Sequence, residues 1–208
     1  MPDTALSKEE KHAQNRAKLS AAAQTVLQRQ GYAKASLRDI AAEAGVSLSK
    51  LHYYFNDKSH LMVSAFRDRQ TRFVRDILDV SAASEDVALR CRRMAALWAS
   101  RTVENGRALL IWYDLRNQSL FEPELRPVVV EMEGMLVAAI LRLVSAEDAS
   151  APLIEEIRLR HIPMLGGLFH HSLQRISFGE TLDPEMLEQS FSDVLQQIAQ
   201  RIGAGSAL

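Results

Sequence analysis

The sequence predicts an all-α protein with a small N-terminal helical domain followed by a larger C-terminal helical domain. Apolar residues make up 47% of the 208 residues, which is enough for a buried core. Only nine Gly and six Pro interrupt the chain. No stretch shows the two-residue alternation of a half-buried strand, and apolar residues recur instead at the three- and four-residue spacing typical of amphipathic helices.

The N-terminal third predicts an arm and a first helix. Residues 1–14 are mostly polar and charged, so we expect a flexible arm. A helix should follow over 15–30, because Leu19, Val26 and Leu27 share one stripe. Gly31 is well placed to end this helix.

Two short helices are predicted next, joined at one glycine. The first should cover 37–44, because Ser36 can cap its free amides while Asp39, three residues later, bonds back to the cap. Gly45 suits the left-handed conformation of a tight turn. Ser47 is positioned to cap the second short helix, which should end near Phe55. This is the local pattern of a helix-turn-helix.

The rest of the chain predicts longer helices. We expect them over 58–80, 85–103, 106–118, 124–145, 152–178 and 184–202. Pro163 cannot donate to a helical ladder, so the segment 152–178 should kink or divide there. The expected organisation is an arm (1–14), a helix-turn-helix domain (15–57), a connecting helix (58–84) and a C-terminal domain (85–208).

Charge is divided along the chain. Residues 1–75 hold 13 Lys and Arg against 7 Asp and Glu, a net charge of +6, whereas the remainder carries −7. A positive segment attracts polyanions, and the negative remainder repels them. Duplex DNA is therefore expected to meet the N-terminal part only.

The sequence lacks the residues that several functional classes of protein require. The single Cys91 excludes an intrachain disulfide and a cysteine-rich metal framework, so we expect neither a metal nor a cofactor. No phosphate-binding glycine loop, two-histidine zinc helix or nucleophile elbow occurs, which disfavours an enzyme and leaves no catalytic residues to name. No apolar run is long enough for a membrane helix or a signal peptide, so a cytoplasmic location is expected.

The second short helix has two distinct faces. Leu51 and Phe55 point toward the other helices, whereas Lys50, Tyr53 and Tyr54 lie on the opposite side. In a helix-turn-helix the second helix lies in the major groove and presents its outer face to bases and phosphates. Outward tyrosines and a lysine therefore favour DNA binding, and the bland alternative is an ordinary helical hairpin with buried tyrosines.

The run SLRDIAAEAGVS at 36–47, then LHYYF at 51–55 and Lys58, resembles the DNA-binding domain of TetR-family bacterial repressors over about residues 15–65. The resemblance implies a homodimer that binds a palindromic operator and is released by a small molecule. At position 52 this chain has His where the family usually has Tyr, and at position 49 it has Ser where a small residue or Gly is common. By position, the resemblance implies DNA contacts from Arg38, Ser47, Leu48, Ser49, Lys50, His52, Tyr53, Tyr54 and Lys58.

The last two helices carry heavy apolar stripes, which the resemblance implies form a four-helix dimer interface. The alternative is that the stripes only seal the protomer core. The expected interface residues are Leu165, Leu168, Phe169, Leu187, Phe191, Val194, Leu195 and Ile198.

A ligand pocket is predicted from Trp, Met and other aromatic residues, which line adaptable apolar sites but also fill ordinary cores. The candidates are Met94, Trp98, Trp112, Tyr113, Phe121, Met132, Met135, Met164 and Phe169. The resemblance implies that a ligand among helices 85–145 shifts the helix 58–80 and so changes the separation of the two reading helices. An architectural DNA binder without an effector, and an activator instead of a repressor, remain open alternatives.

Overall fold

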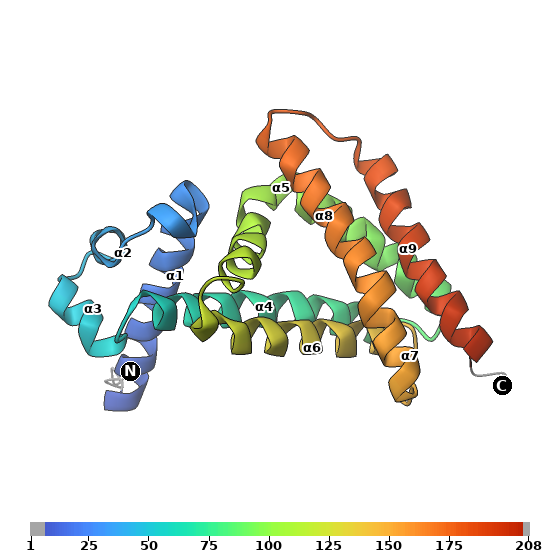
Figure 1. Cartoon of the computed structure of the whole chain (residues 1–208), viewed down its shortest axis with the longest axis horizontal. Helices are drawn as coiled ribbons and strands as arrows, with labels where there is room; N and C mark the ends of the chain where they lie inside the picture. The colour runs from blue at the N-terminus through green and yellow to red at the C-terminus, as the bar shows by residue number, and fades with distance from the viewer. Residues whose placement is uncertain (1–6, 206–208) are drawn as a thin grey trace, which may run out of the picture.

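The computed structural model describes residues 7–205, apart from the side chains of 68–70, 107 and 203–205. Helices form the described part of the chain, as predicted. They are α1 (Lys8–Lys34), α2 (Leu37–Glu43), α3 (Leu48–Tyr54), α4 (Lys58–Ala82), α5 (Val87–Gln118), α6 (Arg126–Leu143), α7 (Ala151–Glu156), α8 (Ile162–Ser177) and α9 (Pro184–Gly205), with a 3₁₀ turn at Pro123–Leu125 and a π-helical turn at Ile157–His161. Figure 1 shows α1–α3 at one end, α4 and α6 side by side along the middle, and α8 and α9 at the other end.

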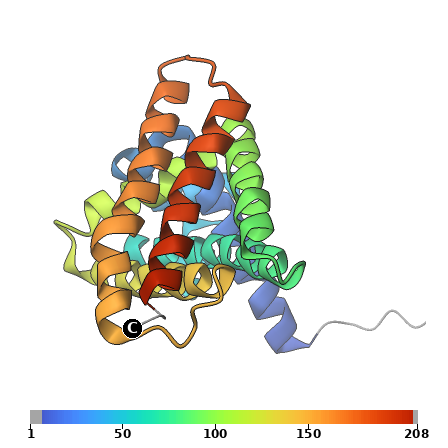
Figure 2. The same cartoon turned by 90° about the vertical axis from the view of Figure 1, so that its right-hand side faces the viewer.

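The predicted arm is helical over much of its length, which corrects our expectation for 1–14. α1 begins at Lys8 because Ser7 caps it: the Ser7 hydroxyl accepts from the Glu10 N–H, and the Glu10 carboxylate accepts from the Ser7 N–H at 2.7 Å. Residues 7–14 are exposed or nearly so, and this first part of α1 projects from the body (Figure 2). Residues 1–6 lie outside the described residues.

The helix-turn-helix forms from the local signals expected of it. Ser36 and Asp39 make a reciprocal capping box at the start of α2. Gly45 adopts a φ of +63°, which only glycine takes without strain, and Ser47 accepts from the Lys50 N–H at the start of α3. Ile40 and other fully buried apolar side chains fix the two helices against α1.

The long C-terminal helices differ from the prediction at their breaks. The expected helices 85–103 and 106–118 form one element, α5, with non-helical backbone angles at Asn105. The segment 152–178 does divide, through a π-helical turn just before Pro163, whose ring and missing N–H disrupt the regular ladder. Among the described helices, none combines the length and the apolar character needed to cross a membrane.

The hydrophobic core crosses the predicted domain boundary. One cluster joins buried residues of α1–α4 to Ile111 and Leu115 of α5 and to Val128 and Met132 of α6. A second cluster joins the first half of α5 to α6, α8 and α9. The second half of α5 therefore packs with the N-terminal helices.

The apolar stripes of α8 and α9 are mostly internal, which corrects the predicted dimer interface. Leu168 and Phe169 are half-buried, and the other six expected interface residues are buried within the protomer, because α9 packs along α5 and its stripe faces the core. These six are Leu165, Leu187, Phe191, Val194, Leu195 and Ile198.

Candidate nucleic-acid interface and ligand cavity

The outer face of α3 is presented to solvent. Tyr53 is 69% exposed, and Lys50 and His52 are exposed beside it. Leu51 and Phe55 are fully buried on the opposite side and hold the helix in place. The remaining predicted contact residues of this region are Arg38, Ser47 and Ser49, which are exposed, and Leu48 and Tyr54, which are half-buried.

His12 joins the tyrosines of α3 in an aromatic group. The His12 ring lies 6.1 Å from the Tyr53 ring and 4.8 Å from the Tyr54 ring, centroid to centroid. The two tyrosines meet edge to face at 4.9 Å. His12 was not predicted, because the arm was expected to lack structure. The Ser7 and Glu10 capping pair is the sequence signal that could have revealed it.

Arg16 anchors the end of α3. Its guanidinium donates to the Tyr54 carbonyl at 2.8 Å and lies 4.3 Å from the centre of the Phe55 ring. A cation bonded to the last carbonyls of a helix complements the negative end of the helix dipole. Arg16 therefore fixes the orientation of α3 against α1.

Lys58 is half-buried, and its ammonium bonds within the protomer instead of pointing freely outward from the predicted DNA-facing surface. Its ammonium donates to the Tyr32 carbonyl at 2.5 Å and lies 4.0 Å from the centre of the Tyr32 ring. Burial lowers the pKa of Lys58, whereas the negative charges of Glu122 and Asp114 act in the opposite direction and raise it.

Tyr32 links the N-terminal helices to α5 and to the turn that follows it. Its backbone N–H donates to the Asp114 carboxylate at 2.5 Å, and its hydroxyl donates to the Glu122 carboxylate at 2.5 Å. Burial, with the hydrogen bond to Glu122, raises the pKa of Tyr32 to about 12. The kink at Gly31, with a φ of +75°, brings this N–H toward Asp114.

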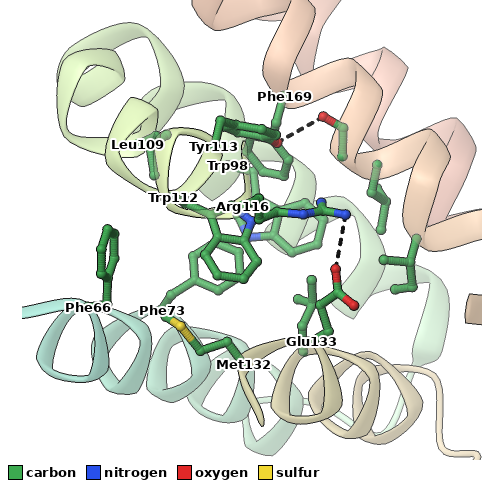
Figure 3. A pocket seen from close by; sticks show the side chains of 14 residues that line it. Phe66, Phe73, Trp98, Leu109, Trp112, Tyr113, Arg116, Met132, Glu133 and Phe169 are labelled. Carbon is green, nitrogen blue, oxygen red and sulfur yellow. Dashed lines mark hydrogen bonds and ion pairs between the residues drawn. The ribbon is translucent and has the colours of Figure 1, made fainter. Parts of the chain in front are cut away.

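A cavity of about 90 Å³ lies between α4, α5, α6 and α8 (Figure 3). Aromatic rings and other apolar groups form most of its wall. Arg116 and Glu133 pair in the wall at 3.0 Å, and the Tyr113 hydroxyl donates to the Gly166 carbonyl at 2.8 Å. Burial raises the pKa of Tyr113. The wall consists of Phe66, Phe73, Trp98, Leu109, Trp112, Tyr113, Arg116, Met132, Glu133, Leu136, Ile162, Leu165, Gly166 and Phe169.

The structure separates the predicted ligand residues into two groups. Those that line the cavity are Trp98, Trp112, Tyr113, Met132 and Phe169. The others do not: Met94 is sealed in the core, and Phe121, Met135 and Met164 lie on the outside, with Phe121 80% exposed.

Sequence reasoning missed other parts of the wall. Phe66 and Phe73 lie on α4, which was expected only to connect the domains, although their spacing of two helical turns was a usable signal. Arg116 and Glu133 give no local signal, because they meet only after α5 and α6 pack together. Among the described residues, no cluster of His, Cys, Asp or Glu could hold a metal ion.

The sequence comparisons concern mainly the N-terminal half. Residues 19–65 match the family model described as bacterial regulatory proteins, tetR family. The nicotine-responsive transcriptional repressor HdnoR of Paenarthrobacter nicotinovorans is 35% identical over 100 residues, which are 48% of this chain and 52% of that protein. The fatty acid metabolism regulator protein of Bacillus subtilis is 28% identical over 115 residues, 53% of this chain and 56% of that protein. The chain thus spans about half the length of the curated relatives it matches.

Solved structures share the whole architecture at lower sequence identity. A putative transcriptional regulator from Pseudomonas aeruginosa PAO1 aligns with a TM-score of 0.71 at 21% identity, covering 90% of this chain and 91% of that one. The fatty acid degradation regulator FadR from Bacillus halodurans aligns with a TM-score of 0.68 at 22% identity, covering 87% of this chain and 94% of that one. The multidrug binding protein EbrR complexed with ethidium aligns with a TM-score of 0.63 at 24% identity, covering 86% of this chain and 98% of that one. The predicted all-α fold class is confirmed.

Proposed function

We propose, from the match of residues 19–65 to the tetR family model and the similarity to a transcriptional repressor, that the protein is itself a transcriptional repressor. It binds a palindromic operator as a homodimer and is released when a small molecule occupies the cavity. The family match favours this function over catalysis, because proteins of this family act by binding DNA.

The observation that carries the proposal is the outer face of α3. Tyr53 and Lys50 are exposed there, while Leu51 and Phe55 anchor the helix from behind. The tyrosine hydroxyl can reach a phosphate or its ring can pack on a thymine methyl, and the lysine adds charge attraction. The positive charge of residues 1–75 favours the same end of the molecule.

A homodimer is proposed through the outer face of α8. Between 163 and 178, all of which the structure describes, the one charged residue is Arg175, whose side chain is 43% exposed and pairs with Glu180. The exposed residues of this stretch are Pro163, Met164, Gly167, His170, His171, Gln174, Ser177 and Phe178. A face with one charge, already paired, and an open glycine permits close approach of an identical helix, and a two-fold axis makes the operator palindromic.

Gly167 allows a clean test of this interface. A Cβ at Gly167 would meet nothing within 4 Å in the protomer, so Gly167→Arg should leave the fold intact. In an α8 interface the new charge would be buried without a partner, which is costly. Sedimentation should then show monomers where the original chain forms dimers. A variant that remains fully dimeric would remove α8 from the proposed interface.

The cavity offers a route from ligand to DNA. Phe66 and Phe73 of α4 form part of its wall, and only three residues separate the end of α3 from the start of α4. A molecule that fits the cavity best when α4 has moved would shift the equilibrium toward the state with the wrong spacing of the two α3 helices.

Footprinting of the purified full chain on the DNA flanking its own gene tests the proposal. We expect protection of an imperfect palindrome that survives an excess of random DNA. Tyr53→Ala should weaken binding to it by about 1–3 kcal/mol and relax the preference at one base pair. Tyr53→Phe is the matched control, because it removes only the hydroxyl. Protection that random DNA abolishes would favour an architectural binder instead.

A further inference from the structure

We propose that the cavity of Figure 3 takes an uncharged aromatic molecule, about one ring in size, that carries a hydrogen-bond acceptor. This inference rests on the proposed function, in which this cavity is the effector site. It adds the chemical class of the effector, which three features of the wall indicate separately.

The volume of the cavity favours a single ring. Its volume is about 90 Å³, well below the roughly 300–1,000 Å³ of sites for drug-sized ligands. It is closer to the engineered cavity of about 150 Å³ that binds benzene. A long acyl chain would extend beyond it into the adjoining cleft of about 620 Å³, which shares Phe73, Trp98, Leu109 and Phe169 with the cavity.

Six aromatic side chains from three helices surround this space. Phe66 and Phe73 come from α4, and the others come from α5 and α8. The Phe73 and Trp98 rings are parallel at 5.9 Å, and the Phe169 ring meets Trp98 edge to face at 5.4 Å. Aromatic rings favour such offset and edge contacts with one another, so an aromatic ligand extends a packing pattern already present.

The charges in the wall are already neutralised by each other. Arg116 and Glu133 supply both full charges, and they pair at 3.0 Å. The Arg116 guanidinium also lies 5.7 Å from the centre of the Trp112 ring. An anionic ligand would have to compete with Glu133 for Arg116, and a cationic ligand would have to compete with Arg116 for Glu133. An uncharged molecule leaves the pair intact.

Trp98 supplies a hydrogen-bond donor that has no acceptor within the described part of the chain. Its side chain is 2% exposed, and its Nε1 is buried with no hydrogen-bond partner among the residues that the structure describes. Indole nitrogen can only donate, and a buried donor without a partner is unfavourable. Tyr113 is less available, because its hydroxyl already donates to Gly166. Because Nε1 is covered by its neighbours in this structure, a carbonyl or ether oxygen of the ligand would satisfy Trp98 once those side chains move aside.

Four probes of similar size separate these features in titrations of the full chain at neutral pH, followed by calorimetry. Acetophenone is uncharged and has an acceptor, ethylbenzene lacks the acceptor, benzoate is an anion and benzylamine is a cation. We expect acetophenone to bind about tenfold more tightly than each of the others. Tighter binding of benzoate or benzylamine, or no binding of acetophenone at millimolar concentration, would overturn the inference.

Two variants locate the effect in the cavity. Trp98→Phe keeps a ring but removes the N–H, so acetophenone should lose about tenfold in affinity and ethylbenzene should not. An equal loss for both probes would refute the role of the N–H. Glu133→Gln frees Arg116, so benzoate should gain about tenfold, and an unchanged benzoate affinity would refute the role of the pair. Circular dichroism checks that each variant is folded.

Failure of this inference and failure of the proposed function give different results. If acetophenone does not bind but the full chain still protects a palindrome, the chemical class is wrong and the repressor proposal stands. If no palindrome is protected under any condition, the repressor proposal fails regardless of how the four probes bind.

Discussion

Replacing Asp114 by alanine should destabilise the protein by removing the bond between α5 and the end of α1. The Asp114 carboxylate accepts the Tyr32 N–H at 2.5 Å, and Tyr32 is only 4% exposed. Without Asp114 this N–H is left buried, and Lys58 loses a nearby opposite charge. A buried backbone donor deprived of a charged acceptor costs about 2–3 kcal/mol, which is the expected loss in free energy of unfolding.

Urea unfolding at one fixed protein concentration measures this loss, with Asp114→Asn and Asn117→Ala for comparison. Asp114→Asn keeps an acceptor but loses the charge, so it should cost about 1 kcal/mol. Asn117 is exposed one turn further along α5, and its alanine variant should stay within about 0.5 kcal/mol of the original chain. If Asp114→Ala were no more destabilising than Asn117→Ala, the Tyr32 contact would not stabilise the fold.

Three further predictions follow from the same geometry. Lys50 is exposed on α3, so Lys50→Ala should make the slope of log affinity for the operator against log salt concentration shallower by about one unit in filter-binding assays. Lys58→Ala should change this slope less, because Lys58 already bonds within the protein. Arg16→Met should reduce the free energy of unfolding by about 1–3 kcal/mol, because the Tyr54 carbonyl loses its charged donor, and an unchanged urea midpoint would contradict this. Burial raises the pKa of the Cys91 thiol to about 11. As pH rises from about 8.5 toward that value, the unfolded chain binds fewer protons than the folded one, so the free energy of unfolding should fall. Cys91→Ala should make that fall smaller in urea titrations on either side of this range.

The helix-turn-helix could be predicted because its signals act over three or four residues. Ser36 bonds to Asp39, Ser47 bonds to the Lys50 N–H, and Gly45 takes a positive φ, all independently of distant parts of the chain. The same periodicity placed Leu51 inside, as the structure has it.

The errors arose where a residue's partner is far away in the sequence. Lys58 was expected on the surface, but it bonds to a carbonyl that the Gly31 kink brings close. The stripe of α9 was assigned to a dimer interface, because an apolar stripe shows that a helix is covered but not by which neighbour. α5 is that neighbour, within the same protomer.

The sequence by itself determined the helices, most of their ends and the exposed face of α3, because capping and periodicity are local properties of the chain. Only the tertiary structure decided that Asp114 is bonded to Tyr32 and that Arg116 meets Glu133 in the wall of a cavity lined by aromatic side chains. Those contacts depend on how long helices cross, which is set by the packing of the whole core rather than by any one segment.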